Sequence, residues 1–490
     1  MRKIVTLVFL YILCPLLMLG ASYPYEEVYK NLPFFMPKIT APVFPDRSVN
    51  LSKFGAKGDG SSLCTEAFAK AIETLSKQGG GKLIVPQGVW FTGPIVLKSN
   101  INLHLEKGAI ILFTPDIDQY PLIKTSFEGL DTRRCQSPIS GNNLTNVAIT
   151  GEGVIDGNGE YWRPLKRAKV TAGQWKTITS RGGVFRDKNY WLPYEGTLKG
   201  EQMSDMNVPQ NVKSEAEWES IKPFLRPVMV SLVACKNVWL QGVIFQNSPA
   251  WNLHPLMCEN LLIEEVQVRN PSYAQNGDGI DVESCKNTLI VNSTFDVGDD
   301  GICIKSGKDE DGRKRGIPTE NVIIDGCTVF KGHGGFVVGS EMSGGVKNIS
   351  VSNCQFLGTD VGLRFKSKRG RGGIVENIYI RNISMFDIVT DAITFDLYYG
   401  GKSAVEDLEE GKSVEVKKMP VDETTPQFRN IDIEDITCRG ARRALYFNGL
   451  PEMPIKNIKL KNIHISAQQN AEFHYSTGIK KENVQITLTK

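Results

Sequence analysis

Two short acidic motifs lie 21 residues apart in the middle of the chain. Asp278 is part of the stretch NGDG, and the adjacent pair Asp299 and Asp300 lies between two glycines. Hydrolysis of a glycosidic bond needs such carboxyl groups, because one must donate a proton to the leaving oxygen while another activates water. Neighbouring residues of a regular strand point to opposite faces, so Asp299 and Asp300 can share a site only where the strand bends, as the flanking glycines permit. A surface turn is the alternative, since Asp and Gly are common turn residues.

An internal repeat predicts the fold that positions these carboxyl groups. An asparagine followed by alternating apolar residues recurs, and several intervals are 23 to 34 residues long. The repeat asparagines are Asn146, Asn237, Asn260, Asn287, Asn321, Asn348, Asn377, Asn430 and Asn457. These intervals are too short for a strand–helix–strand unit at each step but long enough for three short strands. The sequence therefore predicts an all-β fold, a right-handed parallel β-helix. A β-propeller, the other candidate, needs regular blades of about 40 residues.

Small and polar residues of successive coils should stack in this fold. The repeat asparagines would hydrogen-bond along a ladder. Cys235, Cys258 and Cys285 each lie two residues before a repeat asparagine and would stack as small apolar core residues, so we expect few or no disulfides. Residues 49–81 predict a strand, a glycine turn and a helix, which would cap the N-terminal end of the stack.

The N-terminus resembles an export signal. Residues 1–22 combine two basic residues, an apolar run and small residues, which is typical of a secretory signal peptide. A transmembrane anchor is the alternative, although the run is short for a span. Loss of Arg2 and Lys3 would lower the formal net charge from +3 to +1, which gives no support for nucleic-acid binding. We expect an exported monomer, periplasmic or extracellular, with no stable membrane anchor.

The remaining chain divides into an extension and one repeating domain. We predict an N-terminal extension at 23–48 and a single β-helix catalytic domain at 49–490, with loop insertions at about 158–226 and 400–427. The first insertion holds four of the seven tryptophans and would form either a small satellite core or a wall at one end of a groove. The second insertion is charged and predicts a solvated loop.

Further polar residues follow the repeat asparagines at similar offsets. His254, His333, Arg364 and Lys366 lie 12 to 18 residues after the preceding repeat asparagine. Because successive rungs of a β-helix are about 4.8 Å apart, these residues should form a row with the aspartates. Arg364 and Lys366 share one face of a strand and could hold a substrate carboxylate.

At these positions the chain resembles glycoside hydrolase family 28, the polygalacturonase family. The family pattern is N-T-D, D-D, G-H-G and R-x-K. The matching stretches here are Asn276-Gly277-Asp278, Asp299-Asp300, Gly332-His333-Gly334 and Arg364-Phe365-Lys366. Order and spacing agree, and the one departure is Gly277 in place of Thr.

The resemblance implies inverting hydrolysis of α-1,4 galacturonosyl bonds of pectin, without a metal or other cofactor. It makes Asp299 the general acid, has Asp278 and Asp300 position and deprotonate the water, and places His333 in the surrounding hydrogen-bond network. The substrate contacts expected are Asn276, His254, Arg364, Lys366 and Tyr398, with Tyr399 as the alternative to Tyr398.

Residues 362–373 and the long first insertion resemble the bacterial exo-acting branch, which implies release of galacturonic acid from chain ends. Endo action is the alternative. Other hypotheses are a hydrolase of rhamnogalacturonan or xylogalacturonan, a pectate lyase whose calcium the aspartates would bind, and a non-catalytic polysaccharide-binding β-helix.

Overall fold

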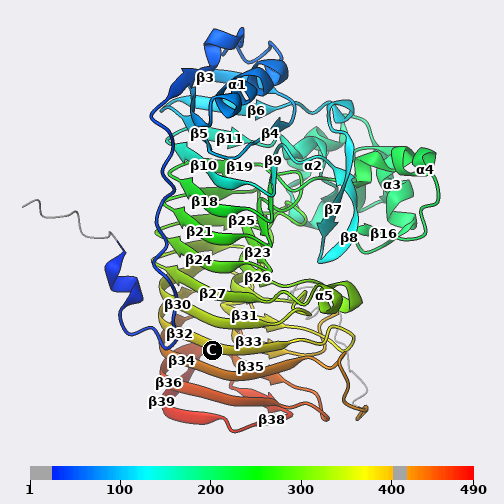
Figure 1. Cartoon of the computed structure of the whole chain (residues 1–490). Coiled ribbons are helices and arrows are strands. Elements are labelled where there is room, and N and C mark those ends of the chain that lie inside the picture. Colours follow the sequence, from blue (N-terminus) through cyan, green and yellow to red (C-terminus); the bar gives the residue numbers. More distant parts are fainter. Residues whose placement is uncertain (1–24, 401–416, 490) are drawn as a thin grey trace, which may run out of the picture.

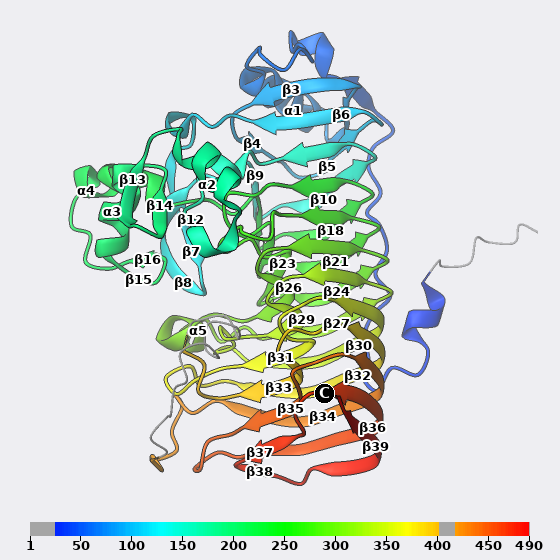
Figure 2. The ribbon, with the colours of Figure 1, turned by 180° about the vertical axis from the view of Figure 1, so that it is seen from behind.

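Stacked coils of parallel strands form the body of the protein. The computed structural model describes residues 25–400 and 417–489. Figures 1 and 2 show the coils following one another from the blue N-terminal end to the red C-terminal end. Each coil adds short strands to three faces, and the strand pairings between coils are parallel. The predicted fold, a right-handed parallel β-helix, is confirmed.

The strands fall into three stacks. The first consists of β1 (Ser48–Asn50), β2 (Gly81–Val85), β5 (Ile101–Leu105), β10 (Thr145–Gly151), β18 (Lys236–Gln241), β21 (Glu259–Glu264), β24 (Lys286–Val291), β27 (Thr319–Asp325), β30 (Val346–Leu357), β32 (Ile374–Phe386), β34 (Gln427–Arg439), β36 (Ile455–Ala467) and β39 (Lys480–Leu488), with β38 (Ser476–Thr477) at its end. The second consists of β3 (Gly88–Thr92), β6 (Ala109–Phe113), β11 (Val154–Asp156), β19 (Ile244–Gln246), β22 (Gln267–Arg269), β25 (Thr294–Val297) and β28 (Thr328–Lys331), and β30 continues it.

The third stack is a separate sheet of eleven strands, and it carries the acidic motifs. Its members are β4 (Ile95–Val96), β9 (Ile139–Asn142), β17 (Val230–Val233), β20 (Leu253–Leu256), β23 (Ile280–Glu283), β26 (Asp300–Lys305), β29 (Gly334–Val338), β31 (Leu363–Lys366), β33 (Asp391–Asp396), β35 (Arg443–Asn448) and β37 (Glu472–His474). Neighbouring strands of this sheet come from successive coils, so residues distant in sequence lie on adjacent rungs.

Asparagines and cysteines stack as predicted. The side-chain amide of Asn260 donates to Asn237 at 3.1 Å, and that of Asn287 donates to Asn260 at 3.1 Å. These asparagines adopt φ of 56° to 59°, a left-handed conformation that asparagine tolerates better than most residues. The nine cysteines of the described residues are free and buried, which confirms the expectation of few or no disulfides for the described part of the chain.

Two N-terminal segments cover the stack. Helix α1 (Thr65–Lys77) buries Phe68, Ile72 and Leu75 against the first coil and caps the open end, as predicted (Figure 1). The preceding segment 25–47 includes the 3-10 turn η1 (Glu26–Tyr29) and runs along the outside of the coils. Its Met36 and Ile39 pack against a cluster that includes Leu262 and Ile323. We call residues 25–47 the strap.

The first insertion folds into a compact lobe beside the third sheet (Figure 2). It contains α2 (Ala172–Thr179), α3 (Glu195–Gln202), α4 (Glu215–Ser220), β12 (Leu165–Lys166), β13 (Val184–Asp187), β14 (Tyr190–Leu192), β15 (Ser204–Asp205) and β16 (Val208–Pro209). Trp162 and Trp191 are buried in it, as expected of a satellite core. A hairpin, β7 (Leu122–Phe127) and β8 (Leu130–Cys135), lies next to the lobe, and α5 (Asp309–Arg315) follows β26.

Some expectations fall outside the described residues. These are the predicted signal peptide 1–22 and most of the second insertion, whose described part is residue 400 and residues 417–427. Within the described ranges, no helix has the length and apolar character needed to cross a membrane.

Candidate active site

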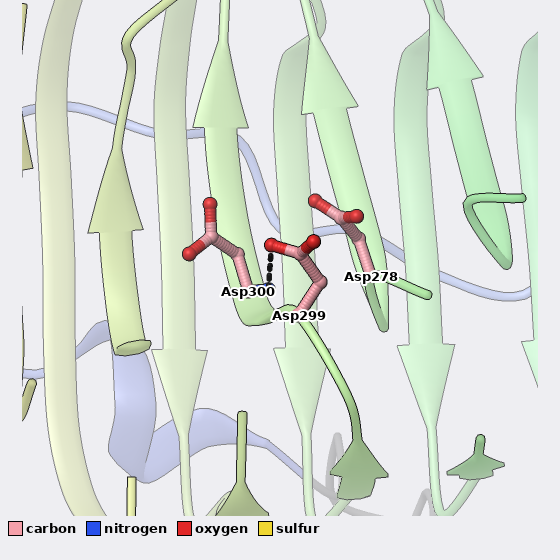
Figure 3. A group of neighbouring side chains, drawn as sticks. All are labelled: Asp278, Asp299 and Asp300. Atoms are coloured by element: carbon pink, nitrogen blue, oxygen red, sulfur yellow. Dashed lines mark hydrogen bonds between the residues drawn. The ribbon is translucent and has the colours of Figure 1, made fainter. Parts of the chain in front are cut away.

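Asp278, Asp299 and Asp300 converge on one point of the third sheet. Asp278 lies just before β23, Asp299 just before β26, and Asp300 is the first residue of β26. Each offers a carboxylate oxygen, and these three atoms all lie within 4.8 Å of one another. Figure 3 shows the three side chains facing the same space, with the backbone N–H of Asp300 donating to Asp299 Oδ1 at 3.0 Å.

A bend before β26 lets the adjacent aspartates share this site. Asp299 lies in the bend and Asp300 on the strand, so the alternation of a regular strand does not separate their side chains. The two flanking glycines are required because a side chain would not fit at either position, and not because their backbone dihedral angles are unusual. A Cβ on Gly298 would lie 2.6 Å from the Pro271 carbonyl oxygen, and one on Gly301 would lie 2.5 Å from the side chain of Val329.

Basic residues from the next two coils contact the same carboxylates. His333 precedes β29, and its Nδ1 lies 2.9 Å from Asp299 Oδ1. Lys366 on β31 places Nζ 2.7 Å from Asp300 Oδ2. Arg364 places Nη1 3.5 Å from Asp300 Oδ1 and 3.4 Å from the His333 carbonyl oxygen. The G-H-G and R-x-K motifs thus meet the D-D motif because they lie on successive rungs.

Burial and charge shift the pKa values of the aspartates in opposite directions. Burial raises the pKa of Asp278 well above its usual range, and the nearby Asp281 and Asp299 raise it further. Burial also tends to raise the pKa of Asp299, but the interaction with His333 and the positive charges of Lys366 and Lys169 outweigh burial and hold this pKa well below its usual range. The surroundings of Asp278 thus favour its protonated form, and those of Asp299 favour its ionised form.

The three carboxylates line a cavity of about 480 Å³. Strands of the β-helix, the hairpin and the insertion lobe all contribute to its wall. Its charged residues besides the aspartates and His333 are Glu128, Lys166, Lys169, Arg186, Glu201, Lys305, Glu341, Lys366, Lys368 and Arg371. Seven of these ten groups are basic, so the part of the cavity wall away from the three aspartates suits an anionic ligand.

Most of the predicted site residues meet at this cavity. Asn276 lines it and accepts a hydrogen bond from Arg226 Nη2 at 2.8 Å. Asp278, Asp299, Asp300, His333 and Lys366 also line it. Arg364 is 4% exposed and lies beneath Asp300 instead of in the wall. The contact of Arg364 with substrate stays a prediction.

Two predicted substrate contacts are misplaced. His254 is 2% exposed and bonds Glu283 Oε2 through Nε2 at 2.9 Å inside the protein, so its expected place on the substrate face is wrong. Tyr398 packs against the hydrophobic core, whereas Tyr399 lines the cavity and lies under the ammonium of Lys366, 4.9 Å from Nζ to the ring centroid. Of the two tyrosines considered, Tyr399 is the one at the site.

The cavity wall also contains residues that the sequence did not single out, among them Lys305. Lys305 lies 3.0 Å from Glu341 Oε2 and 3.4 Å from Asp281 Oδ1, and its ammonium covers the ring of Trp251. A lysine at the end of the apolar strand GICIK was a detectable signal, because a buried charge requires partners. Asp281 lies within β23, where burial raises its pKa to about 8.

The fold and the site together define a carbohydrate-degrading β-helix enzyme, and comparisons agree. Residues 212–483 match the family described as "Glycosyl hydrolases family 28". A Vitis vinifera protein named "Probable polygalacturonase" is 30% identical over 86% of this chain and 75% of its own length. The "Exo-poly-alpha-D-galacturonosidase" of Dickeya chrysanthemi is 28% identical over 82% of this chain and 64% of its own.

A solved structure extends the likeness to three dimensions. The crystal structure of a hyperthermoactive exopolygalacturonase from Thermotoga maritima superposes with a TM-score of 0.72 at 33% identity, covering 92% of this chain and 94% of that one. The chain belongs to glycosyl hydrolases family 28 and is a glycoside hydrolase.

Proposed function

We propose that this hydrolase cleaves α-1,4 galacturonosyl bonds of pectin. The observation that carries the proposal is the convergence of Asp278, Asp299 and Asp300 in a cavity whose other charged groups are mainly basic. Carboxylates supply the acid and base, while lysine and arginine complement a sugar acid. The relatives named for polygalacturonase activity support the same substrate. Rhamnogalacturonan and xylogalacturonan are the alternative substrates.

In the proposed reaction, Asp299 protonates the leaving glycosidic oxygen, and Asp278 and Asp300 hold and deprotonate the water. Lys366 Nζ lies 2.7 Å from Asp300 Oδ2 and holds that carboxylate in place. Because the surroundings in the free site favour a proton on Asp278, this proton has to reach Asp299, and the proximity of the two groups makes them titrate as a coupled pair. An anionic sugar beside Asp299 would offset the positive charges around it and favour that transfer.

The stereochemical outcome is part of the proposal. Inverting glycosidases usually hold their carboxyl groups about 6.5–9.5 Å apart, and retaining ones about 5–5.5 Å. The aspartate oxygens here lie within 4.8 Å, so the separation alone does not favour inversion. Inversion follows from membership of the family, with water bound between Asp278 and Asp300 on the side away from the acid.

We also propose attack from chain ends. The hairpin β7–β8 originates before the catalytic coils, and its tip reaches the segment after β26. The N–H of Lys308 donates to the Gly129 carbonyl at 3.1 Å, and Arg315 Nη2 donates to Ser126 Oγ at 3.1 Å. A Cβ on Gly129 would lie 2.5 Å from Lys308 N, which indicates close docking. The hairpin and the lobe thus support the proposal that the cavity is closed on one side and admits only the end of a polysaccharide chain.

We further propose that the enzyme is exported and acts as a single catalytic domain. The enzyme is exported by means of the signal peptide 1–22, acts in the periplasm or outside the cell as a monomer without a stable membrane anchor, and uses residues 49–490 as one catalytic domain. Its partner is an acidic pectic polysaccharide or oligogalacturonide.

One experiment separates this function from a lyase. The three aspartate oxygens are close enough to bind calcium, as a calcium-dependent pectate lyase would require. Polygalacturonate is incubated with the purified protein and a chelator, and the products are followed by ¹H NMR. We expect saturated products whose new reducing end appears first as the β anomer. Unsaturated products that disappear with chelator would establish the lyase, and an initial α anomer would contradict inversion.

A further inference from the structure

The first insertion brings a lysine to the acid–histidine pair. Lys169 ends the 3-10 turn η5 (Arg167–Lys169), which follows β12. Both ends of this short segment are fixed: the N–H of Arg167 donates to the Asn189 carbonyl at 2.8 Å, and the capping box of Thr171 and Gln174 begins α2 just beyond. Lys169 is therefore held by the lobe and lines the catalytic cavity from it.

The ammonium of Lys169 faces the side of the His333 ring away from Asp299. Lys169 Nζ lies 3.5 Å from His333 Nε2, while His333 Nδ1 lies 2.9 Å from Asp299 Oδ1. The carboxylate of Asp360 also lies near Nε2, with its Oδ2 3.9 Å away. Arg364 approaches the backbone carbonyl of His333 at 3.4 Å. Lys169 and Asp360 thus favour opposite protonation states of Nε2: the ammonium favours a bare nitrogen and the carboxylate a protonated one.

The contact with Lys169 limits which nitrogen of His333 can carry the ring proton. An ammonium group only donates, and a neutral imidazole has one donor nitrogen and one acceptor nitrogen. If Lys169 donates to Nε2, the ring proton is on Nδ1, where it points at Asp299. Without the lysine, the carboxylate of Asp360 would favour a proton on Nε2 and either a charged ring or the other tautomer.

We propose that Lys169 is a positioning residue for the candidate acid: it holds His333 in the tautomer that donates from Nδ1 to Asp299. The inference rests on the proposed hydrolysis by Asp299 and extends it to a residue outside the four family motifs. It gives the insertion a part in the acid–base chemistry besides its part in the cavity wall. In agreement, the charge of Lys169 helps to lower the pKa of Asp299.

The test compares Lys169→Met with the conservative Lys169→Arg. Loss of the charge should shift the pH profile of kcat toward higher pH by roughly 0.5–1 unit, because the carboxylate and the imidazole both lose a positive neighbour. Lys169→Arg should restore the profile. The matched control is Lys368→Met, which removes a lysine from the same cavity wall and should leave the profile in place while changing KM.

A second readout needs no turnover. The chain has five histidines, so ¹⁵N-labelled histidine can report the tautomer of His333 in the free protein. We expect a protonated Nδ1 in the wild type and a changed state in Lys169→Met. An unchanged tautomer and pH profile, with only KM or the melting temperature altered, would overturn the inference. A wild-type protein with the predicted tautomer but no hydrolysis would instead contradict the proposed function.

Discussion

At the scale of single residues, Asp278 and Asp299 differ in their surroundings more than in their chemistry. Asp278 is 3% exposed and borders other carboxylates, whereas Asp299 is hydrogen-bonded to His333. Burial beside like charges favours the protonated form, and a nearby imidazole favours the ionised form. Assigning acid and base in this site therefore requires the charge of the bound sugar as well as that of the protein.

Replacement of Asp299 tests its assigned role. We expect Asp299→Asn to lower kcat on polygalacturonate by about 10²- to 10⁴-fold, because general acid catalysis is worth that much. Circular dichroism should be unchanged, since the amide has nearly the same shape. The control is Asp296→Asn, three residues away on β25 and outside the cavity wall, which should keep wild-type turnover. A fully active Asp299→Asn enzyme would transfer the acid role to another residue.

At the scale of elements, the strap contacts several coils at once. In a solenoid each coil contacts mainly the next one. The strap packs Met36 against residues of β21 and β24, and the ring of Phe34 lies 6.2 Å from that of Tyr379 on β32. It thus links the outer surfaces of several rungs.

Adjacent residues of the strap offer a matched pair of variants. Met36 is 6% exposed and Phe35 is 85% exposed. Met36→Ala should lower the free energy of unfolding by about 2 kcal/mol, because it leaves a cavity in a packed cluster. Phe35→Ala should stay within about 0.5 kcal/mol of wild type. Denaturant unfolding measures both. Equal effects of the two substitutions would mean that the strap does not contribute stability through this cluster.

At the scale of the whole molecule, segments outside the coils enclose the face that carries the candidate active site. The hairpin and the insertion lobe extend from the upper coils, and α5 projects on the same side below the lobe (Figures 1 and 2). The wall of the cavity thus combines residues that are far apart in the chain, such as Glu128 in the hairpin and Tyr399 after β33. Such an enclosure favours a chain end over the middle of a polymer.

Product formation from a long polymer tests the enclosure. We expect reducing ends to appear from polygalacturonate while its viscosity falls slowly, because removal of terminal units hardly shortens a chain. Small saturated products should be present from the earliest samples. Gly129→Ala, which pushes a Cβ into Lys308, should loosen the hairpin tip and speed the fall in viscosity per bond cleaved. A rapid fall with the wild type would establish internal cleavage.

The sequence by itself determined the β-helical coil and the motifs that meet at the candidate site. Asn237, Asn260 and Asn287 mark equivalent bends, and a strict register between coils brings Asp300, His333 and Lys366 onto successive rungs. Both follow from local periodicity, because a two-residue alternation and a repeated turn fix which residues face inward.

Tertiary structure alone decided the rest. His254 is buried and forms a hydrogen bond with Glu283. Tyr399, rather than Tyr398, lines the cavity. Glu128 and Lys169 reach the site from the hairpin and the insertion. These segments lie outside the repeat, so their positions depend on long-range docking that has no period in the sequence.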